Sequence, residues 1–198
     1  MTTATETEES WLTELCQHVE ARPCVLLRLD EDDSKQLAAS RGGFNEFTLA
    51  RTHDLLSAIH PPTVCLIFSA MPEWQGHRGE KPYAHVGIVS SRSPITTLDT
   101  RIKVKRAVHI TPATEQELVT VLDTSTHADQ LRKRLESGAP VVVLSPKLSR
   151  GVIEALAAIP SNQQVLRTLA ESLHAPRRFT NLVIHKEEAQ RFGQMPLL

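Results

Sequence analysis

The chain of 198 residues contains few aromatic residues and few cysteines, the residue type that is frequent in disulfide-rich secreted proteins and in cysteine metal sites. Aromatic residues make up 4% of it, and its three cysteines, Cys16, Cys24 and Cys65, are widely spaced, without metal-ligand spacing. Cys24 and Cys65 lie inside apolar runs, where small buried thiols are common. We therefore expect a reducing, cytoplasmic setting and no cysteine metal site.

Long apolar segments are also missing. The longest apolar run, residues 64–68, is far too short to cross a bilayer. The acidic, Thr-rich N-terminus has neither the basic region nor the apolar region of a signal peptide. We expect a soluble protein without a membrane partner.

The chain has no excess of charge of one sign and no common catalytic motif. Its formal net charge is -1, so affinity for nucleic acid must come from local clusters of charge. HExxH, CxxC, GxSxG, Walker and dinucleotide-binding motifs are all missing. Asp99, with Arg101 and Lys103 after it, imitates the end of a nuclease motif, but no second carboxylate accompanies it to hold magnesium. We expect no catalytic residue, no metal site and no cofactor.

Hydrophobic periodicity indicates a mixed chain of helices and strands. Apolar runs and alternation predict strands over residues 24–29, 63–69, 83–90, 101–110 and 140–144. Helical spacing and caps predict helices over residues 10–21, 34–42, 45–60, 126–138, 149–159 and 161–174, and a capping box of Thr114 and Glu117 predicts a further helix start. This order is not a βαβ alternation. It favours an α+β fold with a small curved or barrel-like mixed sheet, flanking helices and a C-terminal helical segment.

The expected organisation has three parts. Residues 1–9 carry several Thr and Glu and no packing residue, which predicts a disordered tail. Residues 10–148 form the α+β recognition domain, and residues 149–198 form a helical appendage or connector.

Residues 101–110 carry the most informative pattern of the chain. Side chains on a strand alternate between the two faces. One expected face is apolar, with Ile102, Val104, Val108 and Ile110, and the other is cationic, with Arg101, Lys103, Lys105 and His109. Two-residue steps place the Arg and Lys side chains roughly 7 Å apart, close to the phosphate repeat of a nucleic-acid strand. The alternative is an edge strand that uses lysines against aggregation.

The loop over residues 71–82 has the composition of a base-contacting loop. Its glycines permit close backbone approach, an indole stacks on an unpaired base, and amide or guanidinium groups bond the base edge. The residues expected to approach nucleic acid here are Trp74, Gln75, His77 and Arg78, with Tyr83 at the start of the next strand. Alternatively, Trp74 packs back on the sheet as an anchor of the loop.

The strand at residues 63–69, the glycine-bearing loop, the strand Tyr83-Ala84-His85-Val86-Gly87-Ile88-Val89 and the cationic strand resemble PUA-like barrels. That superfamily includes the EVE, ASCH and SRA-type readers of modified nucleic acids. The resemblance covers about residues 24–144. It implies a barrel-like fold and recognition of a modified or flipped base.

A second resemblance involves residues 138–145, 152–162, 166–173, 176–179 and the pair Phe192-Gly193. These are similar to the N-terminal, non-catalytic region of large bacterial proteins whose C-terminal half looks like a PD-(D/E)xK restriction nuclease. In such proteins the nuclease half follows the Phe-Gly pair, whereas this chain ends soon after it. The resemblance implies a recognition part of a restriction or defence system, with cleavage in an absent domain or a partner subunit.

Three functions follow from these observations. The leading expectation is a DNA-binding recognition module. An RNA-binding PUA-like module would use the same residues. A protein-interaction or scaffold module would dock through residues 149–174, with Leu166 and Leu169 at the interface.

Overall fold

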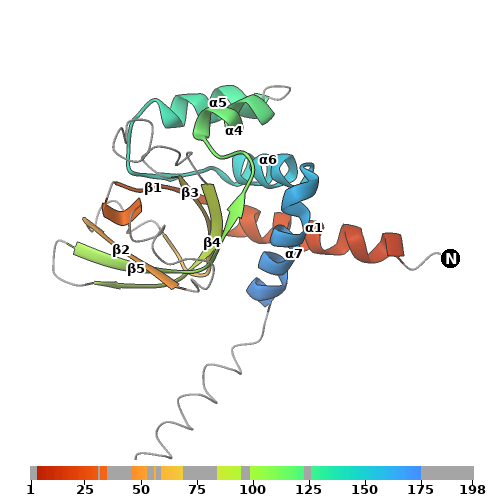
Figure 1. Cartoon of the computed structure of the whole chain (residues 1–198), viewed down its shortest axis with the longest axis horizontal. Coiled ribbons are helices and arrows are strands. Elements are labelled where there is room, and N and C mark those ends of the chain that lie inside the picture. The colour runs from red at the N-terminus through yellow and green to blue at the C-terminus, as the bar shows by residue number, and fades with distance from the viewer. Residues whose placement is uncertain are drawn as a thin grey trace, which may run out of the picture.

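The structure is a computed structural model that describes residues 4–30, 32–34, 46–52, 56, 59–68, 84–94, 99–122 and 126–174. Its helices are α1 (Ala4–Ala21), α4 (Glu115–Val121), α5 (Thr126–Leu135), α6 (Pro146–Ala157) and α7 (Pro160–His174). Its strands are β1 (Val25–Arg28), β2 (Glu46–Thr52), β3 (Thr63–Phe68), β4 (Ala84–Pro94), β5 (Asp99–Ile110) and β6 (Val141–Val143) (Figure 1).

The strands form one six-stranded mixed sheet in the order β2-β5-β4-β3-β1-β6. β1 runs parallel to β3, and the other neighbouring pairs are antiparallel. The sheet curves, with α1, α6 and α7 against its outer side and α4 and α5 near one end (Figure 1). The expected α+β class with a curved mixed sheet and flanking helices is confirmed, and the described strands do not close into a barrel.

Two apolar clusters lie on opposite faces of this sheet. On the helix face, Leu26 of β1 and Leu66 of β3 pack with residues of α1 and of α4 to α7. On the inner face, Leu27 and Ile67 pack with Leu56 from the segment after β2. Since both faces are covered, every residue of β3 is buried, which explains the continuous apolar run at residues 63–68.

The predicted helix over residues 45–60 is wrong for its first half, because Glu46–Thr52 forms β2. Its register places Phe47 opposite Val104 and Leu49 opposite Ile102 on β5. Pairing satisfies the backbone N–H and C=O groups along β5, which a helix in this place would leave without strand partners. The helical spacing of leucines over residues 45–60 does not show whether a neighbouring strand is available for such pairing.

Several predicted element ends also move. α1 begins at Ala4, inside the part expected to be a disordered tail, and β4 continues to Pro94 through part of the expected loop. α6 begins three residues earlier than predicted because Ser145 caps it, with its Oγ accepting from Leu148 N at 3.4 Å. The expected domain boundary between residues 148 and 149 therefore falls inside α6. The capping box of Thr114 and Glu117 is confirmed.

Polar contacts fasten the helices to the sheet. The Arg28 guanidinium donates to both carboxylate oxygens of Glu115, at 2.6 and 2.8 Å. Ser149 Oγ on α6 accepts from Cys24 N at 2.8 Å. The buried Asn162 side chain on α7 accepts from Thr111 N at 2.9 Å and donates to the Thr111 carbonyl. The bonds of Ser149 and Asn162 fix α6 and α7 against the sheet.

In the described ranges, no helix is both long enough and apolar enough to cross a bilayer.

Candidate nucleic-acid interface

The first half of β5 has the alternation that the sequence predicts. Arg101, Lys103 and Lys105 are exposed, whereas Ile102 and Val104 are fully buried in the inner-face cluster. The three cationic side chains therefore lie on the helix face. The Asn162 contact holds α7 near the far end of β5, at Thr111. The cationic half of β5 extends away from that end of the strand.

The second half of β5 does not continue this pattern, because a β-bulge interrupts its pairing with β4. Val86 pairs with Val108, and Ile88 pairs with Lys105, so two residues of β5 oppose Gly87 alone. The extra residue turns the following side chains to the other faces of the sheet. Ile110 consequently belongs to the helix-face cluster, unlike Ile102.

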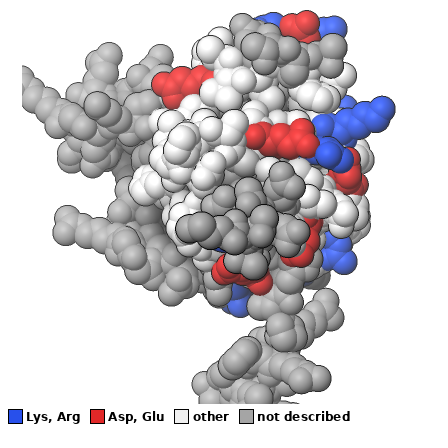
Figure 2. Space-filling view, turned by 90° about the vertical axis from the view of Figure 1, so that its right-hand side faces the viewer, with Lys and Arg blue, Asp and Glu red and all other residues white. Residues whose placement is uncertain are grey.

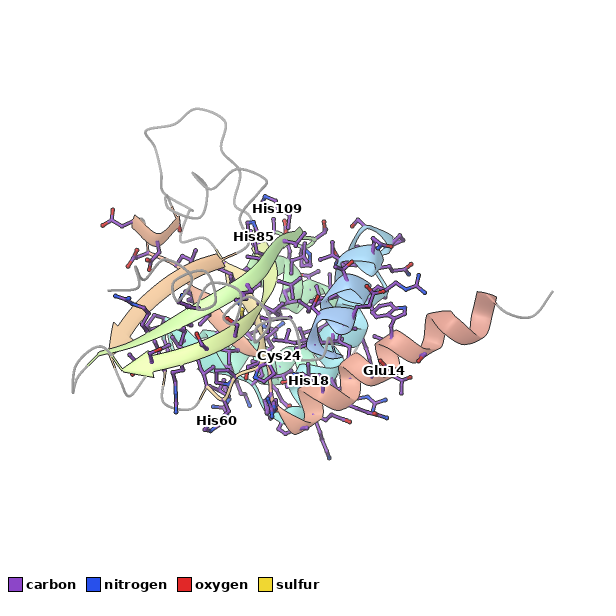
Figure 3. All side chains as sticks on the ribbon, turned by 90° about the horizontal axis from the view of Figure 1, so that it is seen from below. Glu14, His18, Cys24, His60, His85 and His109 are labelled. Carbon is purple, nitrogen blue, oxygen red and sulfur yellow. The ribbon has the colours of Figure 1, made fainter. Side chains whose placement is uncertain are left out.

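Because of the bulge, two side chains, Val108 and His109, lie on other faces of the sheet than the sequence predicts. Val108, predicted on a buried apolar face, is 43% exposed. His109, predicted beside the Arg and Lys side chains, pairs with His85 and lies against its ring, with centroids 4.0 Å apart (Figure 3). Because Ala84 and Val86 belong to the helix-face cluster, His85 between them points to the inner face. The two histidines therefore lie on the face opposite to the cationic side chains.

Burial gives His85 an unusual protonation equilibrium. The side chain is 8% exposed, and this loss of solvent, together with the neighbouring His109 ring, lowers the pKa of His85 to about 4. His85 is therefore neutral at physiological pH. It contributes no positive charge to a nucleic-acid surface.

On its outer side, the cationic half of β5 pairs with β2. The register places Ala50 opposite Arg101, Thr48 opposite Lys103 and Glu46 opposite Lys105. The cationic row therefore lies on an interior strand of the sheet, between β2 and β4.

The expected base-contacting residues, Trp74, Gln75, His77, Arg78 and Tyr83, lie outside the described residues. The strands that flank them end at Phe68 and begin at Ala84, which are paired with each other. Ala84 in turn pairs with Ile110 of β5. Five residues of strand separate Ile110 from Lys105, a length of about 17 Å. The strand ends that flank these residues, Phe68 and Ala84, thus lie at the opposite end of β5 from Arg101.

The remaining candidate groups are structural. Burial raises the pKa of Cys16 to about 11 and that of Cys24 to about 12, and it raises the pKa of Cys65 further. All three thiols stay protonated at neutral pH and provide no thiolate nucleophile. Among the described residues, no three His, Cys, Asp or Glu side chains gather closely enough to hold a metal ion.

The prediction that Leu166 and Leu169 lie at a docking surface is wrong, because both side chains are buried. Leu166 and Leu169 are 0% and 2% exposed and pack in the helix-face cluster. They stabilise this chain's own core and are not accessible to a partner. A pocket between α1, α6 and α7, which includes Trp11 and Arg167, is not among the sites that the sequence predicts. The signal available for it was an indole near the start of a helix in a chain with few aromatic residues.

Comparisons with protein-family models, with curated proteins and with solved structures find no match to this chain. The functional argument consequently depends on the geometry described above.

Proposed function

We propose that this chain is a DNA-binding recognition module of a bacterial restriction or defence system, which reads a modified or flipped base. The observation that supports the proposal is the row of exposed cationic side chains on β5, Arg101, Lys103 and Lys105. Their backbone is held in a six-stranded sheet between β2 and β4, so their spacing is fixed before a ligand arrives. Binding of phosphates therefore does not have to order the backbone of the row, which lowers its entropic cost.

The proposal includes a PUA-like relationship for residues 24–144. In this relationship the curved mixed sheet corresponds to the barrel of PUA-like proteins. In this proposal Trp74, Gln75, His77, Arg78 and Tyr83 approach the base. The phosphate contacts at β5 set orientation, and the loop contacts provide selectivity. The module itself is not catalytic, and a nuclease domain or partner subunit supplies cleavage.

Charge on the chain as a whole does not explain such binding. The formal net charge is -1. On the face that includes α1 and α7, Figure 2 shows acidic and basic side chains interspersed. Another cationic cluster, on α5, is partly neutralised, because Arg132 donates to Asp129 at 2.6 Å. Affinity for DNA therefore depends on the local row on β5.

Replacing the row tests this proposal. In the variant Arg101→Ala/Lys103→Ala/Lys105→Ala, we expect weaker binding to duplex DNA and a shallower dependence of affinity on salt. Each lost phosphate contact reduces the slope of log K against log salt by about 0.9. Loss of all three contacts therefore reduces it by roughly 2 to 3. Fluorescence anisotropy over a salt series measures both quantities.

The matched control is Lys133→Ala/Arg134→Ala on α5, two exposed cations near the opposite end of the sheet. We expect this variant to keep the slope of the unmodified chain. Equal slopes for the β5 variant and the unmodified chain would remove β5 from the interface. Competition with a sequence-matched RNA duplex separates a DNA reader from an RNA-binding module, because the proposal requires DNA to compete more strongly.

A further inference from the structure

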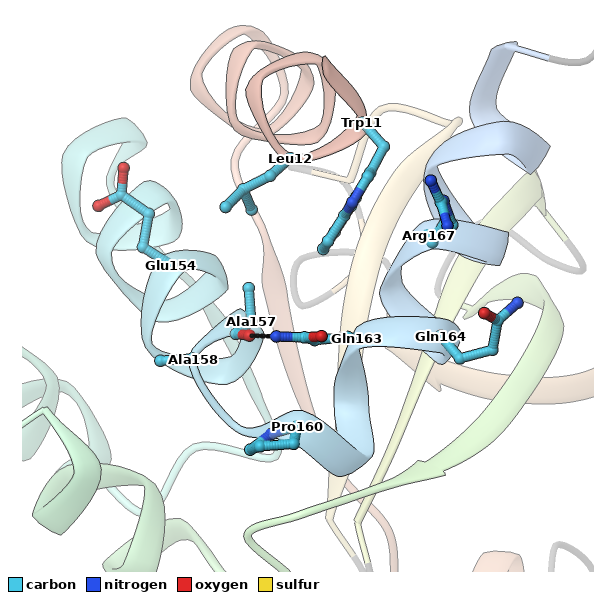
Figure 4. Close-up of a pocket in the computed structure, with 9 residues that line it drawn as sticks. All are labelled: Trp11, Leu12, Glu154, Ala157, Ala158, Pro160, Gln163, Gln164 and Arg167. Atoms are coloured by element: carbon cyan, nitrogen blue, oxygen red, sulfur yellow. Dashed lines mark hydrogen bonds between the residues drawn. The ribbon is translucent and has the colours of Figure 1, made fainter. Parts of the chain in front are cut away.

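A pocket of about 530 Å³ lies where α1 meets α6 and α7. This volume is within the range of about 300–1,000 Å³ that small-molecule sites occupy. Trp11 and Leu12 of α1 line one side of this pocket. Figure 4 shows the Trp11 indole between α6 and α7. The other lining residues are Glu154, Ala157, Ala158, Pro160, Gln163, Gln164 and Arg167.

The sequence at the corner between α6 and α7 leaves this space open. Ala157, Ala158 and Pro160 have short side chains, so they do not fill the gap that the turn creates. Gln163 Nε2 donates to the Ala157 carbonyl at 3.3 Å and holds the floor of the pocket in place (Figure 4). The indole of Trp11 is partly buried against the helix-face core. The pocket is therefore built on packed elements, and the aromatic side chain in its wall has limited freedom.

The charges in the pocket are unequally compensated. Glu154 accepts from Arg150 Nε at 2.8 Å, and Arg150 also contacts Glu20 at 3.2 Å. Arg167 is half-buried beside Trp11, on the side of the pocket away from Glu154 (Figure 4). In the part of the chain that the structure describes, Arg167 makes no salt bridge. The pocket thus combines an indole with a cation that lacks a counter-ion there.

We propose that this pocket binds a nucleotide, with the base against the Trp11 indole and the phosphate on the Arg167 guanidinium. An aromatic face attracts any base by stacking. The amide of Gln164 offers both a donor and an acceptor to the base edge. Arg is the side chain best suited to bidentate phosphate contact. A free nucleoside monophosphate and an unpaired nucleotide in a strand share this chemistry. The site does not depend on β5 being an interface.

Trp11 itself reports binding. Trp11 and Trp74 are the two tryptophans of the chain, so Trp74→Phe leaves Trp11 as the sole source of indole emission. Titrating this variant with adenosine or guanosine monophosphate should quench the emission saturably. Adenosine without phosphate should bind at least tenfold more weakly, because it lacks the charge-assisted hydrogen bonds between the phosphate and Arg167. A single-stranded oligonucleotide that quenches at lower nucleotide concentration than the monophosphate would identify a strand as the source.

Arg167→Gln in the same background should weaken binding of the monophosphate about tenfold and leave adenosine binding unchanged. The control Arg134→Gln removes an exposed cation on α5 and should change neither. Arg167 makes no hydrogen bond or salt bridge with the described residues of the core, and thermal unfolding checks that both variants keep their fold. The proposal is overturned by absence of saturable quenching with every monophosphate, or by equal binding of adenosine and its monophosphate. The variant Lys103→Ala/Lys105→Ala should bind monophosphates normally, so failure of the β5 interface and failure of this pocket are distinguishable.

Discussion

At the scale of single residues, burial decides what each polar group does. His85 and His109 are neighbours across two strands, but His85 is 8% exposed and His109 is exposed. The buried ring loses its hydration, which disfavours the imidazolium form. Buried Asn162, in contrast, has bonds to Thr111 and to the Leu156 carbonyl, so its burial contributes a fixed connection between α7 and β5.

The lowered pKa of His85 predicts a dependence of stability on pH. In the unfolded chain the His85 imidazole binds a proton near pH 6.5, whereas in the folded chain its pKa is lowered to about 4. Stability is therefore fully present above about pH 6.5 and falls as the pH decreases through this window. From about pH 7 to about pH 5 we expect a loss of about 2 kcal/mol that His85→Gln removes.

Urea unfolding of both proteins over the same pH series measures this difference, since titrating groups that do not contact His85 contribute equally to each. His60→Gln is the control, because it replaces an exposed histidine that precedes β3 and leaves the His85 side chain in place. We expect this variant to keep the decrease that comes from His85. An identical decrease in the His85→Gln variant would show that His85 is not responsible.

At the scale of elements, one extra residue in β5 determines which side chains share a surface. The cationic row and the histidines would lie on one face of a regular strand. The bulge opposite Gly87 separates them. A Cβ at Gly87 would lie 2.8 Å from Val104 Cγ1, 3.2 Å from the Lys105 carbonyl oxygen and 3.4 Å from Ala107 Cα. Glycine at this position therefore permits the close approach that the bulge requires.

Gly87→Ala is expected to destabilise the chain by about 1–3 kcal/mol, the usual cost of overpacking. Part of that cost comes from Val104, so Gly87→Ala should cost less in a Val104→Ala background. A double-mutant cycle by urea unfolding measures this coupling. If Gly87→Ala costs the same in both backgrounds, the backbone contact with Lys105 and Ala107 is the main source of strain.

At the scale of the whole molecule, α6 and α7 belong to the same packed body as the sheet. Val152, Ile153 and Leu156 of α6 and Leu166 and Leu169 of α7 share one cluster with β1, β3 and β4. Each such side chain contributes about 1.5–3 kcal/mol when it is buried. Together they match the whole free energy of unfolding of a domain, about 5–15 kcal/mol.

A chain that ends at residue 148 should therefore lose its cooperative thermal transition, although the expected recognition domain ended there. A chain that ends at residue 174 keeps both helices and should retain the transition. Circular dichroism melting curves compare the two. A cooperative transition in the shorter chain would show that residues 10–148 fold without α6 and α7.

The sequence determined the features that depend on neighbouring residues. Alternation at residues 101–105, the apolar run at 63–68 and the capping box of Thr114 and Glu117 each follow from local geometry, and each is present. They were sufficient to predict an α+β chain and the exposed cationic row.

Only the tertiary structure decided the features that depend on distant residues. Glu46–Thr52 became a strand because β5 offers it backbone partners, and the bulge exists because β4 presents Gly87 there. The pocket forms because Trp11 meets Arg167 across more than 150 residues of sequence. Hydrogen-bond pairing and packing between distant segments have no local signature, so a single sequence read by periodicity does not contain them.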